Sequence, residues 1–153
     1  MCFKEPIKIQ DEFSLFSLAS EYLDAAEILI RTPPLKTNVS LVAYYLLGHA
    51  AELFLKSLLC LDGVSIKELK STKRYGHNLS KLLEEAQRRG LLFSGMYNSV
   101  RSFSNVYTGK NTEYRQTDLV SLPHLDTLVV EARGLKDRSF NRVSISNLKC
   151  GEG

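Results

Sequence analysis

The chain has 153 residues, of which 44% are hydrophobic and 24% charged, and its formal net charge is +3. This length and balance predict one globular domain with a real core and exclude a disordered chain. Residues 1–60 carry five Lys or Arg against seven Asp or Glu, whereas residues 61–153 carry fifteen against ten. The second part could therefore present a basic face to nucleic acid or another anion, or simply a solvated surface of mixed sign.

Three cysteines, Cys2, Cys60 and Cys150, lie far apart and form no Cys-x-x-Cys pair. An odd, unclustered set argues against a disulfide framework and a zinc site, and it fits a reducing cytoplasm. The N-terminus shows no secretory signal, and charged residues interrupt the longest apolar stretch, residues 41–61. We therefore expect a cytoplasmic protein with no membrane span, no bound metal and no cofactor.

Apolar residues recur at helical spacing along most of the chain. Asp11 is a plausible N-cap for a first helix, which ends before two consecutive prolines because proline lacks an amide donor. Gly63 ends a second long helix, Asn78 caps a third, and Pro123 suits the first turn of the last. The predicted helices cover about residues 11–31, 39–61, the short segment 66–69, 79–89, 94–107 and 123–136.

The predicted fold class is all-α, a four- to five-helix antiparallel bundle, because no segment shows the alternating pattern of a strand. The first two long helices should pack as an antiparallel pair. One domain is expected over residues 1–138, followed by a loose C-terminal tail over 139–153, although residues 143–148 could dock on the domain. Residues 108–118 form a polar connection of the length that often carries function.

A polar strip runs along the otherwise apolar second helix. At 100° per residue, its members fall within roughly 60° of one another. Burying charge in an apolar helix is costly unless the charge is paired, so the strip should lie in an interface or in a site. It could line a pocket for a nucleotide or a phosphate, or form a hydrogen-bonded network that fixes helix register or a dimer seam. The strip consists of Tyr45, His49, Glu52 and Lys56.

The start of the third long helix is a second candidate. His77 and Asn78 lie where free amides and a partial positive charge attract an anion, with Lys73 and Arg74 close by in sequence. Alternatively, His77 bonds to the polar strip of the second helix and Asn78 serves only as a cap.

A third candidate lies in the polar connection. Tyr114 could stack on a base while Arg115 binds a phosphate, with Lys110 nearby. One tyrosine and two cations are also a common combination in surface loops, so the segment could equally have no ligand.

Two stretches, His49-Ala-Ala-Glu-Leu-Phe-Leu-Lys-Ser-Leu-Leu and Tyr75-Gly-His-Asn-Leu-Ser-Lys-Leu-Leu, resemble the HEPN superfamily of small helical bundles from prokaryotic defence and toxin–antitoxin systems. A later segment with tyrosine and arginine is matched by Tyr107 and residues 113–115, and the resemblance spans about residues 11–135. It implies a homodimer that pairs along its long helices, and it raises RNA cleavage as an activity. The polar strip, the Gly-His helix start and the basic second half favour RNA or a nucleotide as ligand, and a cognate nucleotidyltransferase or another defence protein is a possible partner.

HEPN ribonucleases carry an arginine, four to six intervening residues and then a histidine, and two copies meet across a dimer in a metal-independent site. None of the histidines His49, His77 and His124 has an arginine at that distance. Arg74 precedes His77 by three residues and Arg115 precedes His124 by nine. We therefore expect a binding or regulatory module. The alternatives are a divergent endoribonuclease that uses His77 with Arg74 or Arg115, and a structural, partner-binding subunit.

Overall fold

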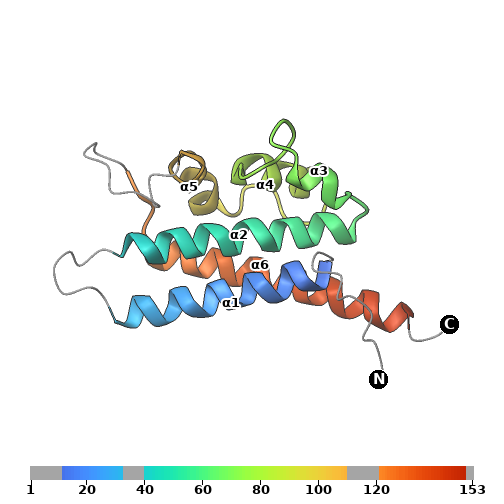
Figure 1. Ribbon diagram of the computed structural model, residues 1–153, viewed down its shortest axis with the longest axis horizontal. Helices are drawn as coiled ribbons and strands as arrows, with labels where there is room; N and C mark the ends of the chain where they lie inside the picture. The colour runs from blue at the N-terminus through green and yellow to red at the C-terminus, as the bar shows by residue number, and fades with distance from the viewer. Residues whose placement is uncertain (1–11, 33–39, 110–120, 151–153) are drawn as a thin grey trace, which may run out of the picture.

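The computed structural model describes residues 12–32, 40–109 and 121–150, and the regular structure in these ranges is entirely helical (Figure 1). This confirms the all-α prediction, and the predicted helix starts lie within four residues of the observed ones. No helix in these ranges is both long and apolar enough to cross a membrane. The helices are α1 (Glu12–Arg31), α2 (Leu41–Leu61), α3 (Ile66–Lys70), α4 (Leu79–Arg88), α5 (Asn98–Thr108) and α6 (Leu125–Cys150).

The last helix is longer than the sequence suggested. We expected it to end near Lys136 and residues 139–153 to form a loose tail, but α6 continues to Cys150. Ser139 is fully buried and its hydroxyl donates to the carbonyl of Phe54 on α2 at 3.2 Å, and Val143 is buried one turn later. The prediction was wrong because this serine- and asparagine-rich stretch has weak intrinsic helix propensity, whereas its packing stabilises the helix.

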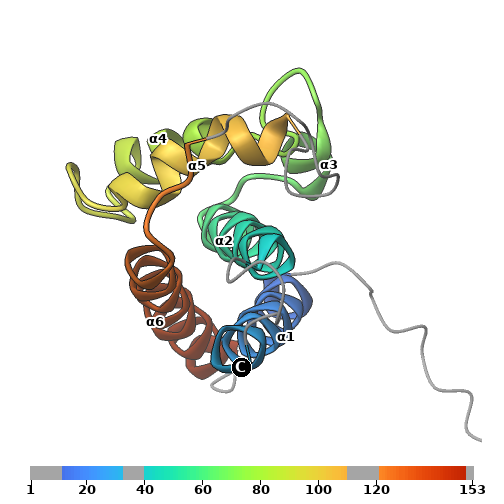
Figure 2. The ribbon, with the colours of Figure 1, turned by 90° about the vertical axis from the view of Figure 1, so that its left-hand side faces the viewer.

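The three long helices lie side by side. The α1 and α2 helices are antiparallel, as predicted, and α6 runs alongside both of them (Figure 1). A view along their axes shows α4 and α5 lying across α2, on the side away from α1 (Figure 2). With neighbours on several sides, α2 is the central element, which explains why buried residues occupy most of its circumference.

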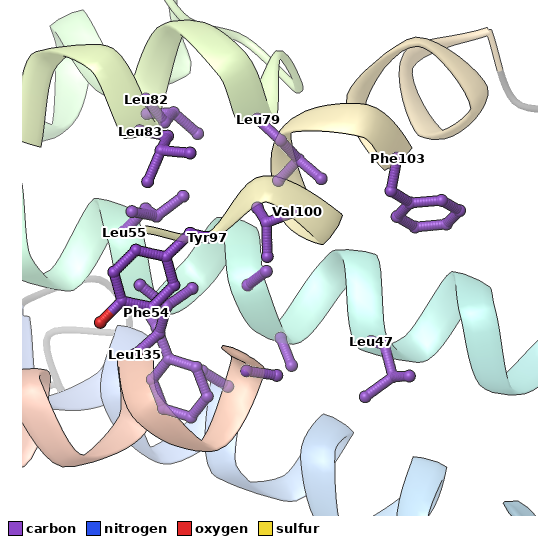
Figure 3. Close-up of a cluster of buried hydrophobic side chains, with 14 of the residues drawn as sticks. Leu47, Phe54, Leu55, Leu79, Leu82, Leu83, Tyr97, Val100, Phe103 and Leu135 are labelled. Atoms are coloured by element: carbon purple, nitrogen blue, oxygen red, sulfur yellow. The ribbon is translucent and has the colours of Figure 1, made fainter. Parts of the chain in front are cut away.

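The core surrounds α2 and includes buried side chains of α1, α4, α5 and α6, and Figure 3 shows the part where α2, α4, α5 and α6 converge. Its large apolar side chains are almost completely removed from solvent, which contributes about 1.5–3 kcal/mol for each one relative to an exposed position. The prominent members are Leu47, Phe54, Leu55, Leu79, Leu82, Leu83, Val100, Phe103 and Leu135.

The α5 helix begins four residues later than predicted and has an unusual N-terminus. Its N-cap residue, Tyr97, has a left-handed backbone with φ of 66° and provides no side-chain cap. The amides of Ser99 and Val100 instead donate to the Glu131 carboxylate of α6, at 3.1 and 2.8 Å. A distant helix thus satisfies the first amides of α5, so local capping signals could not locate its start.

Candidate functional site

Glu52 lies at the centre of a polar network on α2, with a side chain only 4% exposed. The ammonium of Lys56 donates to Oε1 at 2.7 Å, and the hydroxyl of Tyr107 on α5 donates to Oε2 at 2.5 Å. His77, just before α4, places Nδ1 3.1 Å from each carboxylate oxygen. Because an ionised carboxylate only accepts hydrogen bonds, Nδ1 of His77 carries the proton and donates it.

The network keeps the Glu52 carboxylate ionised. Burial raises its pKa, but the Lys56 charge and the hydrogen bonds from Lys56, Tyr107 and His77 outweigh that effect, and the net result is a lowered pKa. Lys56 is itself 9% exposed, so the two charges form a buried pair. Burying such charges is costly unless they are paired, and Glu52 and Lys56 meet this requirement through their contact with each other.

His49 extends the network through Tyr107. Because the Tyr107 hydroxyl donates to Glu52, its oxygen can accept a hydrogen bond from Nδ1 of His49. The His49 ring packs edge-on against Tyr22, with 4.9 Å between centroids, and stacks on Tyr45 at 5.0 Å. Its side chain is 24% exposed. These contacts fix His49 as a packed, oriented part of the network.

The position of Tyr107 depends on a glycine of α2. A Cβ atom on Gly48 would lie 2.5 Å from the Tyr107 ring and 2.9 Å from the Phe103 ring. Only glycine lets α5 approach α2 this closely, and the approach brings the Tyr107 hydroxyl to Glu52. Sequence analysis did not identify Tyr107 as a partner of Glu52. The available signals were the glycine on the face of α2 beside the strip and the need of a buried carboxylate for donors.

A tight turn holds His77 over Glu52. The carbonyl of Ser71 accepts hydrogen bonds from three successive amides, and Gly76 closes the turn with a left-handed φ of +49°. The Asn78 side chain then caps α4, and the Thr108 hydroxyl donates to the His77 carbonyl at 3.3 Å. The alternative in which His77 bonds to the polar strip and Asn78 caps the helix therefore matches the observed contacts.

The imidazole of His77 faces two environments. Nδ1 points to the buried carboxylate, yet the side chain is 63% exposed. Within the described ranges no hydrogen bond reaches Nε2. The network therefore presents one ring nitrogen, with its lone pair, to the solvent.

Exposed cations surround His77 in the sequence. Residues 66–81, which we call the basic segment, contain five Lys or Arg, all exposed, and one carboxylate, Glu68. Glu68 completes the capping box of α3 and also accepts a hydrogen bond from Arg74. The exposed cations are Lys67, Lys70, Lys73, Arg74 and Lys81.

Comparison of the chain with protein-family models, curated proteins and solved structures gave no match. What the site can do chemically is therefore inferred from its own side chains. His77 can donate or accept a proton at Nε2, and the cations of the basic segment can neutralise phosphate charge. Within residues 12–32, 40–109 and 121–150, no three His, Cys, Asp or Glu side chains could share a metal ion.

The structure brings together some of the predicted site residues and not others. His49, Glu52, Lys56 and His77 converge, with Asn78 next to them as the cap of α4. The guanidinium of Arg74 is bonded to Glu68 of α3. Three predicted residues, Tyr114, Arg115 and Lys110, lie outside the described residues.

A surface hollow of about 490 Å³ lies between α1 and α6, and it shares no residue with the network around Glu52. Two of its lining groups, Glu27 and Arg133, form an ion pair with 2.6 Å between Oε1 and Nε. This ion pair occupies two of the charged side chains that line the hollow, whereas the exposed imidazole of His77 has a ring nitrogen open to a ligand.

Proposed function

We propose that the protein is a HEPN-like binding or regulatory module that binds RNA through the basic segment and His77. One observation supports this most directly: a buried carboxylate fixes an exposed imidazole within a stretch that carries five exposed cations and one acid. Lys and Arg side chains of this kind bind phosphates and release counterions from nucleic acid. Cations spread over a surface suit an extended polyanion better than a single nucleotide.

The proposal also includes a biological setting, which the resemblance alone implies. It places the protein in a prokaryotic defence or toxin–antitoxin system in the cytoplasm, as a homodimer that also meets a cognate nucleotidyltransferase or other defence protein. Several large apolar side chains on the long helices are exposed, among them Phe13, Leu18 and Ile28 on α1 and Val42 on α2, and pairing along these helices would cover such side chains. Sedimentation of the purified protein measures the oligomeric state.

RNA binding can be tested by fluorescence anisotropy with a labelled single-stranded RNA at low and moderate salt. We expect the affinity to fall steeply with salt, and Lys73→Glu to weaken binding about tenfold at low salt, because it places a repulsive charge in the basic segment. Arg142→Glu is the matched control, since Arg142 is exposed on α6, on the other side of α2 from α3 (Figure 2). Undetectable binding at low salt, or equal losses in both variants, would refute the proposal.

Cleavage of RNA is the second candidate, and the contact between Glu52 and His77 favours it. A carboxylate that holds Nδ1–H leaves Nε2 able to take a proton from a ribose hydroxyl, as a general base does. If the protein is such an endoribonuclease, structured RNA should be cut in the presence of a chelator, and His77→Ala should abolish cutting. Cleavage that persists unchanged in that variant would belong to another site or to a contaminant.

A further inference from the structure

The two ring nitrogens of His77 differ in a way that favours nucleophilic chemistry at one of them. Nδ1 donates to the buried Glu52 carboxylate, so in the neutral ring the lone pair is at Nε2. Nε2 belongs to a side chain that is 63% exposed. We propose that His77 is a phosphorylation site, which accepts a phosphoryl group at Nε2 from an activated donor, an acyl phosphate or a phosphoramidate.

The phosphoryl transfer requires only the imidazole of His77 and the activated donor. The Nε2 lone pair forms a bond to phosphorus while the bond from phosphorus to the donor oxygen or nitrogen breaks, and the carboxylate or amine leaves with that electron pair. The imidazole ring then carries positive charge. Glu52 stabilises this charge through the Nδ1–H hydrogen bond, because Lys56 and Tyr107 keep the carboxylate ionised and oriented.

The surroundings also suit the product. A phosphoryl group adds about two negative charges and three strong acceptor oxygens. The basic segment supplies exposed cations on both sides of His77 in the sequence, among them Lys73 and Lys81. The modified residue therefore lies in a stretch whose charge complements the added group.

The other two histidines provide internal controls, and the structure describes both. His124 is 78% exposed, but its nearest carboxylate, Asp126, is 3.7 Å from Nδ1 and is itself 82% exposed. Nothing buried therefore orients the His124 ring. His49 is 24% exposed and packs against Tyr22 and Tyr45. Of the three, His77 alone combines exposure with a buried carboxylate partner.

The test uses potassium phosphoramidate, which phosphorylates accessible histidines, on the full chain. Peptide mass spectrometry over time gives separate rates for His77 and His124, and NMR identifies the modified nitrogen. We expect His77 to react at least tenfold faster than His124, with phosphorus on Nε2. Equal rates, or attachment at Nδ1, would overturn the proposal, and this comparison needs no variant.

A double variant tests the role of the carboxylate. Glu52→Gln with Lys56→Met removes both buried charges together, so it leaves neither unpaired, and circular dichroism checks that it is folded. The rate at His77 should fall to that of His124, whose own rate should not change. A His77 rate that is unchanged in the folded double variant would show that Glu52 does not activate the ring and would overturn the proposed mechanism.

A regulatory consequence rests on the proposed RNA binding. Phosphorylated His77 adds negative charge to the basic segment, so the modified protein should bind RNA about tenfold more weakly than the unmodified protein. Phosphorylation is measured by mass and RNA binding by anisotropy, so the two can fail separately. Rapid labelling without RNA binding would refute the proposed function only, whereas RNA binding without selective labelling would refute the modification site only.

Discussion

Lys56 reaches back one helical turn to Glu52, and both side chains are less than a tenth exposed. Removing two charges from water costs several kcal/mol for each ion, and their attraction offsets this only when the geometry is good and the remaining polar atoms are bonded. Here Tyr107 and His77 supply the further hydrogen bonds to the carboxylate. Removing one charge of the pair should therefore lower the free energy of unfolding more than removing both charges together.

Lys56→Met tests this directly. It should lower the free energy of unfolding by about 3–5 kcal/mol, because it leaves the Glu52 carboxylate buried without its counter-charge. Urea denaturation followed by circular dichroism measures the loss. The double variant Glu52→Gln/Lys56→Met should recover most of it, and Arg88→Met, which breaks an exposed pair with Glu85, should cost only a small fraction of it. A double variant as unstable as Lys56→Met would contradict the argument.

At the scale of residues, the sequence predicted the members of the network better than its contacts. Helical periodicity places His49, Glu52 and Lys56 on one face because they are neighbours along a single helix. Tyr107 lies 55 residues from Glu52, and the contact exists only because α5 packs closely on α2. Contacts of that kind depend on the tertiary arrangement, which periodicity does not encode. The roles of Tyr114 and Arg115 remain predictions.

At the scale of elements, the helices could be predicted where their ends carry local signals. Ser65 and Asn78 cap α3 and α4 with their own side chains, and those starts were predicted correctly. The start of α5 and the end of α6 depend instead on other helices, through Glu131 in one case and the burial of Val143 in the other. Helix termini that are stabilised by contacts with another helix carry no recognisable capping signal in the adjacent sequence.

Glu131→Gln should therefore destabilise α5 although the substitution lies on α6. It removes one of two acceptors and the negative charge that faces the first amides of α5, which should cost about 1 kcal/mol of unfolding free energy. Hydrogen exchange at Ser99 and Val100 should accelerate more than exchange in α2. Glu84→Gln, which alters an exposed pair with Arg101, is the control and should change stability by less than about 0.5 kcal/mol. Equal effects of the two variants would argue against a cap between helices.

At the scale of the whole molecule, ion pairs join helices that are distant in sequence. Arg133 of α6 donates to Glu27 of α1, and Arg89 at the end of α4 bonds both Glu85 and Asp62, which follows α2. The hydrogen bond from Arg133 lowers the pKa of Glu27 despite partial burial. Hydrogen bonds from Arg88 and then Arg89 lower the pKa of Glu85 to about 2. The folded chain thus holds several carboxylates ionised more firmly than the unfolded chain does.

The protein should consequently lose stability in acid. A carboxylate whose pKa is lower in the folded state stabilises the fold above its unfolded pKa, near 4.5, and this contribution disappears as the pH falls toward the folded value. The free energy of unfolding should therefore be nearly constant above about pH 5 and should decline between about pH 5 and pH 2. Over this interval the unfolded chain binds more protons than the folded chain. The double variant Glu27→Gln/Glu85→Gln should lose about 1 kcal/mol less unfolding free energy over this interval than the wild type. The effect is small because both carboxylates are near the surface, where solvent screens their ion pairs. Urea midpoints measured across this pH range test the slope, and an identical slope in the wild type and the double variant would refute the assignment.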